Sequence, residues 1–154
     1  VILVGELRDL ETISTAITAS EMGILVMATL HTNGAAATVD RMVNAFPPDK
    51  QSHVRTMLST SLRGVVSQQL IPRKGPPGRV AAIEVLINTP AVSNLIRQGK
   101  IDQLETAMQA GAALGMRTMD AAIQQLLDSG QISGRSAYEK AINKSKFEER
   151  KDFD

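Results

Sequence analysis

Cysteine is absent from the 154 residues, which excludes disulfide bonds and thiolate metal sites. His31 and His53 are the only histidines, so a zinc site is not expected. Neither charge dominates, because 17 lysines and arginines face 16 aspartates and glutamates. This balance gives no bulk attraction to nucleic acid or to anionic lipid, and we expect no nucleic-acid partner.

Long apolar runs and a phosphate-binding loop are also missing. No stretch is long enough to span a bilayer and the first residues do not resemble a signal peptide, so we expect no transmembrane segment and a cytoplasmic location. No G-x-x-x-x-G-K-[ST] motif occurs, so nothing in the sequence can cradle the α- and β-phosphates of a nucleotide. By itself, the chain should not hydrolyse ATP.

The opening residues predict an α/β core. Val1 to Val4 form an apolar strand-like run with no preceding cap, turn or methionine, and we therefore expect a fragment whose missing part lies upstream. Asp9 is expected to cap a helix that ends near Met22. The unbroken apolar run from Ile24 to Leu30 predicts a second strand, covered on both faces. Strand, helix and strand in this length imply a right-handed parallel crossover.

Two further helices are expected after this crossover. Apolar residues from Ala36 to Phe46 recur at helical spacing, with Thr32 or Asn33 available as the cap. A second stripe, from Val54 to Val66, predicts a helix that begins near Asp49. His53 lies off that stripe and is expected to be solvated.

The rest of the chain predicts a hairpin and then short helices. Residues 69–71 and 79–87 flank a turn-rich segment with basic residues, which indicates a β-hairpin with a mobile tip. From Thr89 the pattern changes to short helices, capped by Thr89, Thr118 and Ser133, and a charged, frayed end is expected from Lys144. We thus expect an α/β part over residues 1–88 and a helical domain over residues 89–154.

The candidate chemistry lies at the ends of the two predicted parallel strands. Glu6 follows the first strand, and His31 follows the second with Thr29 and Thr32 beside it. Parallel strands share one carboxyl edge, where open α/β folds bind ligands. A carboxylate that orients water and a polar group that contacts a terminal phosphate suit phosphoryl transfer to water. The alternatives are a surface acid and a histidine with a purely structural hydrogen bond. Arg8 and Asp9 could form a charge pair at this crevice, although Asp9 is already explained as a helix cap.

These segments resemble a known family. Residues 1–9 with Glu11 and Thr12 resemble the Walker B segment, ending in glycine-glutamate, of the motor ATPases that power type IV pili and type II secretion. Residues 23–32 are similar to the His box of that family. A third segment resembles the retraction motif of the twitching-motility branch of that family, and it consists of Ala91, Val92, Ser93, Asn94, Leu95, Ile96, Arg97 and Gln98. The similarity continues through residues 114–120 to 130–132 and so covers nearly the whole chain.

The resemblance implies the C-terminal part of a RecA-like P-loop ATPase core followed by a small helical domain. It implies a homohexamer that binds ATP and Mg²⁺ between subunits and works on a pilus platform at the inner membrane. Glu6 would be the catalytic glutamate and His31 the residue that links the nucleotide to the next subunit. Gly5, Arg8, Thr29 and Thr32 would form the neighbourhood of the site. No residue is expected to ligate a metal directly, although Glu6 could hold Mg²⁺ through water.

Two other functions remain open at the level of sequence. The chain could belong to an assembly or secretion motor of the same family, many of which carry paired C-x-x-C zinc motifs in this region, whereas this chain has no cysteine. Alternatively, it could serve as a non-catalytic interaction domain. At Ser93 and Gln98 the retraction branch usually has arginine and glutamate, so the charge pattern of that predicted helix differs.

Overall fold

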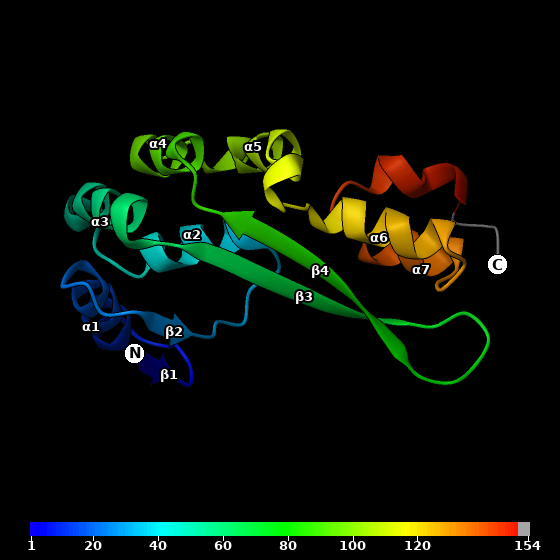
Figure 1. Cartoon of the computed structure of the whole chain (residues 1–154), viewed down its shortest axis with the longest axis horizontal. Coiled ribbons are helices and arrows are strands. Elements are labelled where there is room, and N and C mark those ends of the chain that lie inside the picture. Colours follow the sequence, from blue (N-terminus) through cyan, green and yellow to red (C-terminus); the bar gives the residue numbers. More distant parts are fainter. Residues whose placement is uncertain (151–154) are drawn as a thin grey trace.

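A computed structural model describes residues 1–150 of the protein as an elongated arrangement of short strands and helices (Figure 1). The elements are, in chain order, β1 (Ile2–Val4), α1 (Leu10–Glu21), β2 (Val26–Ala28), α2 (Ala35–Asn44), α3 (Pro48–Ser61), β3 (Gly64–Pro72), β4 (Arg79–Ile87), α4 (Pro90–Gln98), η1 (Ile101–Gln103), α5 (Leu104–Ala110), η2 (Ala112–Leu114), α6 (Met119–Asp128), α7 (Gly134–Lys140) and η3 (Lys144–Arg150). Within these residues, no helix has the length and hydrophobicity of a membrane span.

The β1–α1–β2 segment confirms the predicted parallel crossover. The two strands pair in parallel, with Leu3 opposite Met27. Asp9 caps α1, and its carboxylate accepts a hydrogen bond from the Thr12 backbone N–H at 2.8 Å. The second strand was predicted to be covered on both faces, which is wrong for the described residues, since Met27 is 56% exposed, and Leu3 opposite it is 78% exposed. The side chains alternate, so α1 covers the face of Val4 and Val26 while nothing in residues 1–150 packs over the other face.

The segment after α3 corrects the predicted third helix. We expected Val65 and Val66 on its apolar stripe, but both lie in β3, and Val66 is 72% exposed. Leu62 adopts an extended conformation that ends α3, and Gly64 then pairs with Ile87 in the antiparallel β3–β4 hairpin. A Cβ atom on Gly64 would lie 2.9 Å from the Leu86 carbonyl oxygen, so glycine permits this close strand pairing.

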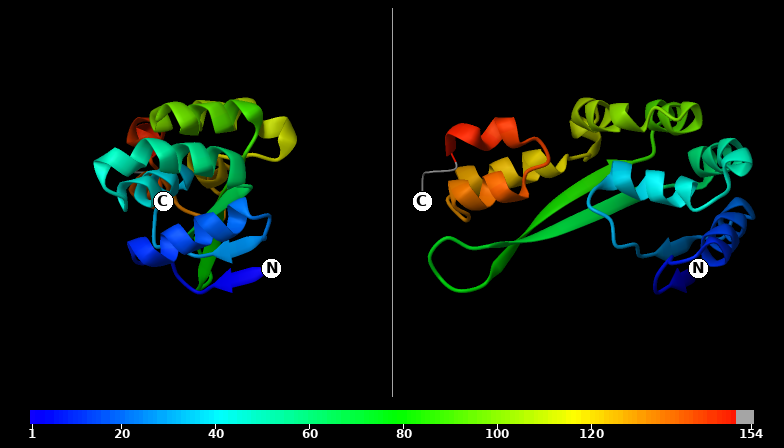
Figure 2. Two further views of the ribbon diagram at one scale, coloured as in Figure 1. Left: turned by 90° about the vertical axis from the view of Figure 1, so that its left-hand side faces the viewer. Right: turned by 180° about the vertical axis from the view of Figure 1, so that it is seen from behind.

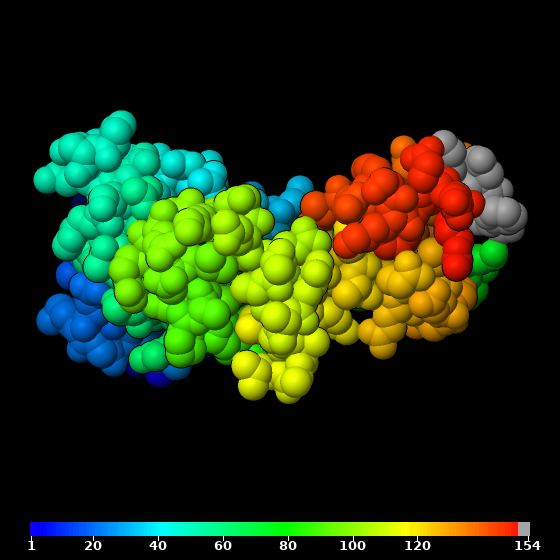
Figure 3. All heavy atoms as spheres, turned by 90° about the horizontal axis from the view of Figure 1, so that it is seen from above, coloured from blue at the N-terminus to red at the C-terminus, as the bar shows by residue number. Residues whose placement is uncertain are grey.

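The hairpin joins two hydrophobic clusters (Figure 2). One cluster contains buried residues of α1 to α5 together with Leu86 of β4. The other contains Ile71 and Ala82 of the hairpin, packed against α6, α7 and Phe147 of η3. Residues of α4 and α5 also belong to the first cluster. The division into two domains at residue 88 stays a prediction. Figure 3 shows residues of α4 and α5 between the N-terminal and C-terminal ends of the molecule.

With Asp9 included, the predicted helix caps are confirmed at four positions and wrong at one. Thr89, Thr118 and Ser133 accept hydrogen bonds from backbone N–H groups of α4, α6 and α7. Helix α2 instead begins after Gly34, which makes no side-chain cap, so neither Thr32 nor Asn33 has the predicted role. The free N–H groups of α2 must therefore find acceptors elsewhere.

The C-terminal segment also differs from its prediction. We expected a frayed, exposed end from Lys144, but residues 144–150 form η3, and Phe147 is only 1% exposed. The aromatic ring completes the second hydrophobic cluster, which is why this charged segment is held in place. The part of the prediction that concerns residues 151–154 lies outside the described residues.

Candidate functional site

Glu6, Arg8 and His31 lie together beyond the ends of the parallel strands. The Arg8 Nε donates to Glu6 Oε2 at 2.6 Å, and His31 Nε2 lies 3.4 Å from Glu6 Oε1. The Glu6 side chain is 24% exposed, whereas Arg8 and His31 are 77% and 85% exposed. Of the two roles considered for Asp9, the structure has the helix cap and not the pair with Arg8, because its carboxylate accepts hydrogen bonds from Thr12 at the start of α1.

The backbone around Glu6 is fixed by the neighbouring strand. The Leu7 N–H donates to the Thr29 carbonyl oxygen at 2.9 Å, and the Thr29 hydroxyl donates to the Gly5 carbonyl oxygen. The residues on both sides of Glu6 are thus tied to the segment that leads to His31. Gly5 and Thr29 hold the geometry of the acid, while the exposed side chains of Arg8 and His31 remain accessible from solvent.

Thr32 faces α2 and not the carboxylate. Its hydroxyl is 2.7 Å from the Thr38 hydroxyl, which also donates to the Gly34 carbonyl oxygen at 2.8 Å. Thr32 therefore organises the loop after His31, and a role in contacting nucleotide stays a prediction.

The predicted retraction motif lies on α4, on the opposite side of the fold from β1 (Figure 1). Val92 and Ile96 are fully buried and hold α4 in the first hydrophobic cluster. The Ser93 hydroxyl donates to the Ser59 carbonyl oxygen at 2.6 Å, and Arg97 reaches the Ser59 hydroxyl at 3.4 Å. Within this chain the motif is not brought to Glu6, and its assignment stays a prediction.

A cavity of about 570 Å³ lies beside the site, between β2, the helices α1 and α3, and β3. Thr29 and Thr32 line it, but Glu6 and His31 do not. Most of its other lining residues are apolar, and Arg63 is the only charged one among them. A phosphate requires several N–H donors or cations, so this cavity has the wrong chemistry for a triphosphate.

The ionisation of Asp9 is coupled to the start of α1. The Thr12 backbone N–H and hydroxyl, which donate to the carboxylate, lower the pKa of Asp9 from its usual 3.8. This charge lies at the N-cap of α1, where it interacts favourably with the helix dipole. Asp9 is therefore a structural cap beside the candidate site.

Sequence reasoning missed a buried acidic residue on β4. Glu84 is 2% exposed on β4, and its carboxylate accepts the backbone N–H groups of Ala35 at 2.6 Å and Met119 at 2.8 Å. The available signal was the strand alternation, which places Glu84 on the same buried face as Ala82 and Leu86. A charge at such a position requires partners, and here they are the starts of two helices.

Comparison with known proteins identifies several relatives. The profile of a family described as "Type II/IV secretion system protein" matches residues 1–134. The type IV pilus retraction ATPase PilT of Pseudomonas aeruginosa is 53% identical over 141 residues, which are 92% of this chain and 41% of that protein. A twitching motility protein of Neisseria gonorrhoeae is 52% identical over 143 residues, 93% of this chain and 38% of that protein.

A solved structure shares the same fold. The crystal structure of the pilus retraction motor PilT with bound ADP matches with a TM-score of 0.85 and 42% identity, over 96% of this chain and 41% of that chain. The chain thus spans about two fifths of the length of the relatives it matches.

Proposed function

The chain belongs to the type II/IV secretion system protein family, and on that premise we propose that it is part of an ATPase motor that powers type IV pilus retraction and twitching motility. The observation that carries the proposal is the meeting of Glu6 with Arg8 and His31 at one strand edge. Over 92% of this chain the similarity to a protein named as a retraction ATPase supports the choice of branch. In this proposal, residues 1–88 are the C-terminal part of a RecA-like core and residues 89–154 a helical domain.

Glu6 acts on water in the proposed reaction. One of its carboxylate oxygens is bound by Arg8, and the other faces the imidazole of His31. A carboxylate held from both sides can orient the attacking water and accept its proton as the terminal phosphoryl group is transferred. His31 is exposed, so its imidazole is free to contact a phosphate or a group of a neighbouring subunit.

We propose that no residue of this chain coordinates Mg²⁺ directly. Residues 1–150 hold no group of three or more histidines or carboxylates that could bind a metal. The lone Glu6 carboxylate already has Arg8 and His31 against its oxygens. We propose that Glu6 would approach Mg²⁺ only through water, with the ion held mainly by the nucleotide. Bound there, Mg²⁺ would neutralise charge on the phosphate oxygens.

The complete motor needs parts that this chain does not contain. The phosphate-binding loop, and with it ATP binding, would come from a preceding segment of the protein, so the chain alone would be inactive. We propose a homohexamer with nucleotide between subunits, located in the cytoplasm and acting on a platform protein at the inner membrane. The exposed position of His31 supports a contact between subunits.

Deletion of the encoding gene tests the direction of the motor. Loss of a retraction motor leaves pili on the cell and abolishes twitching, and complementation with the wild-type gene but not with Glu6→Gln restores twitching. If the deletion removes pili instead, the protein is an assembly motor. If Glu6→Gln restores twitching fully, the chain acts as a non-catalytic interaction domain.

A further inference from the structure

The buried carboxylate of Glu84 connects two helices that are far apart in the sequence. Its Oε1 accepts the N–H of Ala35, the first residue of α2, and its Oε2 accepts the N–H of Met119, the first residue of α6. Glu84 itself lies on β4 and is 2% exposed. A negative charge at a helix start satisfies unpaired N–H groups and complements the helix dipole. One side chain does this here for two helices.

The first of these helices directly follows the loop of His31. Gly34, at the end of that loop, donates its N–H to the Ser67 hydroxyl of β3 at 3.0 Å. Its carbonyl oxygen accepts the Thr38 hydroxyl, which in turn meets Thr32. The loop from His31 to Gly34 is therefore hydrogen-bonded to the hairpin through Ser67. The next residue, Ala35, is hydrogen-bonded to the hairpin through Glu84.

The conformation of Gly34 and its closeness to Glu84 favour glycine at this position. Its φ of +103° is one that side chains rarely adopt, and a Cβ atom there would lie 3.4 Å from Glu84 Oε1. The chain thus passes close to the carboxylate before α2 begins. A change in the position of Glu84 would shift the end of the His31 loop, because Ala35, whose N–H binds the carboxylate, directly follows Gly34 in the chain.

The second helix belongs to the C-terminal part of the fold. Met119 is fully buried in the cluster that contains Ile123 and Phe147, so α6 is anchored independently of the candidate site. The two oxygens of one carboxylate are at a fixed separation. Movement of α6 relative to α2 therefore stretches at least one of the two hydrogen bonds. A buried N–H group that loses its acceptor in this way destabilises the fold.

We propose that Glu84 is a positioning residue that sets the His31 loop against Glu6 and ties its position to that of α6. The proposal rests on the proposed function, since the relevance of the loop comes from His31. Glu84 does not touch the reacting atoms. It acts through the backbone of Ala35 and Gly34, and its loss lowers turnover without removing a group that binds nucleotide.

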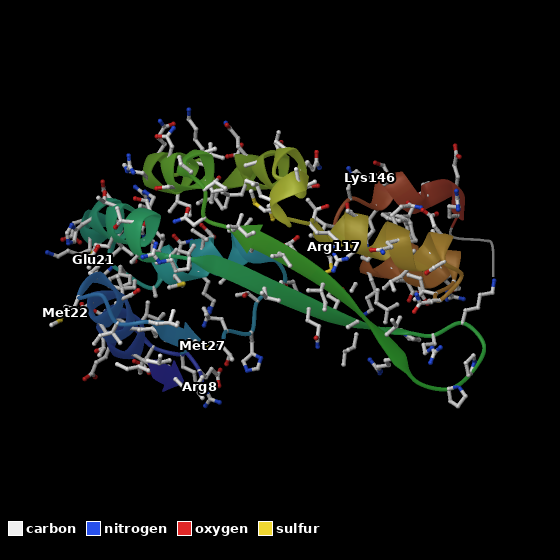
Figure 4. All side chains as sticks on the ribbon, in the orientation of Figure 1. Arg8, Glu21, Met22, Met27, Arg117 and Lys146 are labelled. Atoms are coloured by element: carbon white, nitrogen blue, oxygen red, sulfur yellow. The ribbon has the colours of Figure 1, made fainter. Side chains whose placement is uncertain are left out.

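The test uses Glu84→Gln in the complete protein, with Asp120→Asn as the matched control. In Glu84→Gln an NH₂ group replaces one acceptor oxygen, so one of the two helix starts loses its partner. Asp120 is also a buried carboxylate, 3% exposed, that accepts two backbone N–H groups, from Ile142 at 2.7 Å and Asn143 at 3.0 Å. It lies beside Lys146 in the C-terminal part, well away from Arg8 (Figure 4).

Two readouts are measured for both variants: steady-state ATP turnover and amide hydrogen exchange. Glu84→Gln should lower kcat about tenfold with KM changed less than about threefold, the pattern of a positioning defect. Exchange in residues 31–38 should rise at least about tenfold. Asp120→Asn should raise exchange in residues 141–147 and leave kcat within about twofold of wild type. Glu84→Asp keeps the carboxylate on a shorter side chain that cannot reach the Ala35 and Met119 N–H groups together, so it should act as Glu84→Gln does but less strongly. Glu84→Asp replaces Glu84→Gln if the latter variant fails to fold.

The outcomes separate this proposal from the proposed function. If exchange in residues 31–38 is unchanged in Glu84→Gln or, should that variant not fold, in Glu84→Asp, Glu84 does not position the loop, whatever the turnover. If Asp120→Asn lowers kcat as much as Glu84→Gln, the effect is general destabilisation and the proposal is wrong. If the wild-type protein hydrolyses no ATP, the proposed function fails, while the exchange readout still decides whether Glu84 holds the loop.

Discussion

Replacement of Phe147 by alanine tests whether the C-terminal segment is packed, as the structure has it, or frayed, as its charged sequence indicates. Phe147 is 1% exposed and packs in one cluster with Ile71, Met119 and Ile123. Truncation of a buried phenylalanine to alanine costs about 3–5 kcal/mol. Because η3 packs mainly against the short helix α7, we expect much of this cost to appear as local opening of residues 144–150 and not as global unfolding.

Limited trypsin digestion measures this opening. Lys144 and Lys146 lie in η3, and the Lys146 ammonium is 3.6 Å from the Glu105 carboxylate. A loss of 3 kcal/mol in local stability raises the open fraction about a hundredfold, so cleavage after these lysines should accelerate by about that factor in Phe147→Ala. Phe46→Ala provides the matched control, since Phe46 is a partly buried phenylalanine of the other cluster.

The digestion rates show whether η3 is packed or frayed. The packed arrangement predicts rapid cleavage of Phe147→Ala after Lys144 and Lys146, with wild-type rates there in Phe46→Ala. Equal rates in wild type and Phe147→Ala would refute the packing of η3. Equal acceleration in both variants would show that the effect is not local to the second cluster.

Three further changes are expected to have distinct effects. Because Thr12 lowers the pKa of Asp9 below 3.8, the stabilisation by this charge is present above that pH and lost as the pH falls through the lowered value. Asp9→Asn, which keeps a capping oxygen, should therefore remove this pH dependence in urea denaturation at about pH 3 against pH 7. Thr118→Ala should reduce the free energy of unfolding by about 1 kcal/mol through loss of the α6 cap, measured in the same assay. His31→Ala should lower ATP turnover of the complete protein with an unchanged melting temperature, because the side chain is 85% exposed, and unfolding of this variant would instead indicate a structural histidine.

Local signals in the sequence were sufficient for much of the fold. Thr89 and Thr118 precede helical runs, and each caps its helix in the structure. The turn-rich segment between β3 and β4 likewise predicted the hairpin. Such caps and turns depend on neighbouring residues, so they can be read without knowledge of the tertiary structure.

The errors arose where distant contacts decide the local structure. Val65 and Val66 continue a helical stripe, but pairing with β4 draws them into a strand. Phe147 stands in a charged segment, and only the cluster beneath η3 explains its burial. Glu84 serves helices that start 49 residues before it and 35 residues after it, and no local pattern reveals such partners.

The candidate site could be predicted in part from the sequence. Glu6 and His31 follow strands whose parallel pairing is inferred from chain length, and this pairing brings them within 3.4 Å of each other. The contact of Arg8 with Glu6 in place of Asp9 depends on side-chain geometry that the sequence does not encode locally.

ATP turnover of Glu6→Gln in the complete protein tests the central claim most directly. The matched control is Glu21→Gln, which changes an exposed acid at the last residue of α1, outside the segment that resembles Walker B. If Glu6 orients the attacking water, its amide should lower turnover by about a hundredfold or more while binding of a fluorescent ATP analogue is retained. The control should keep wild-type turnover. Unchanged turnover in Glu6→Gln would contradict the account.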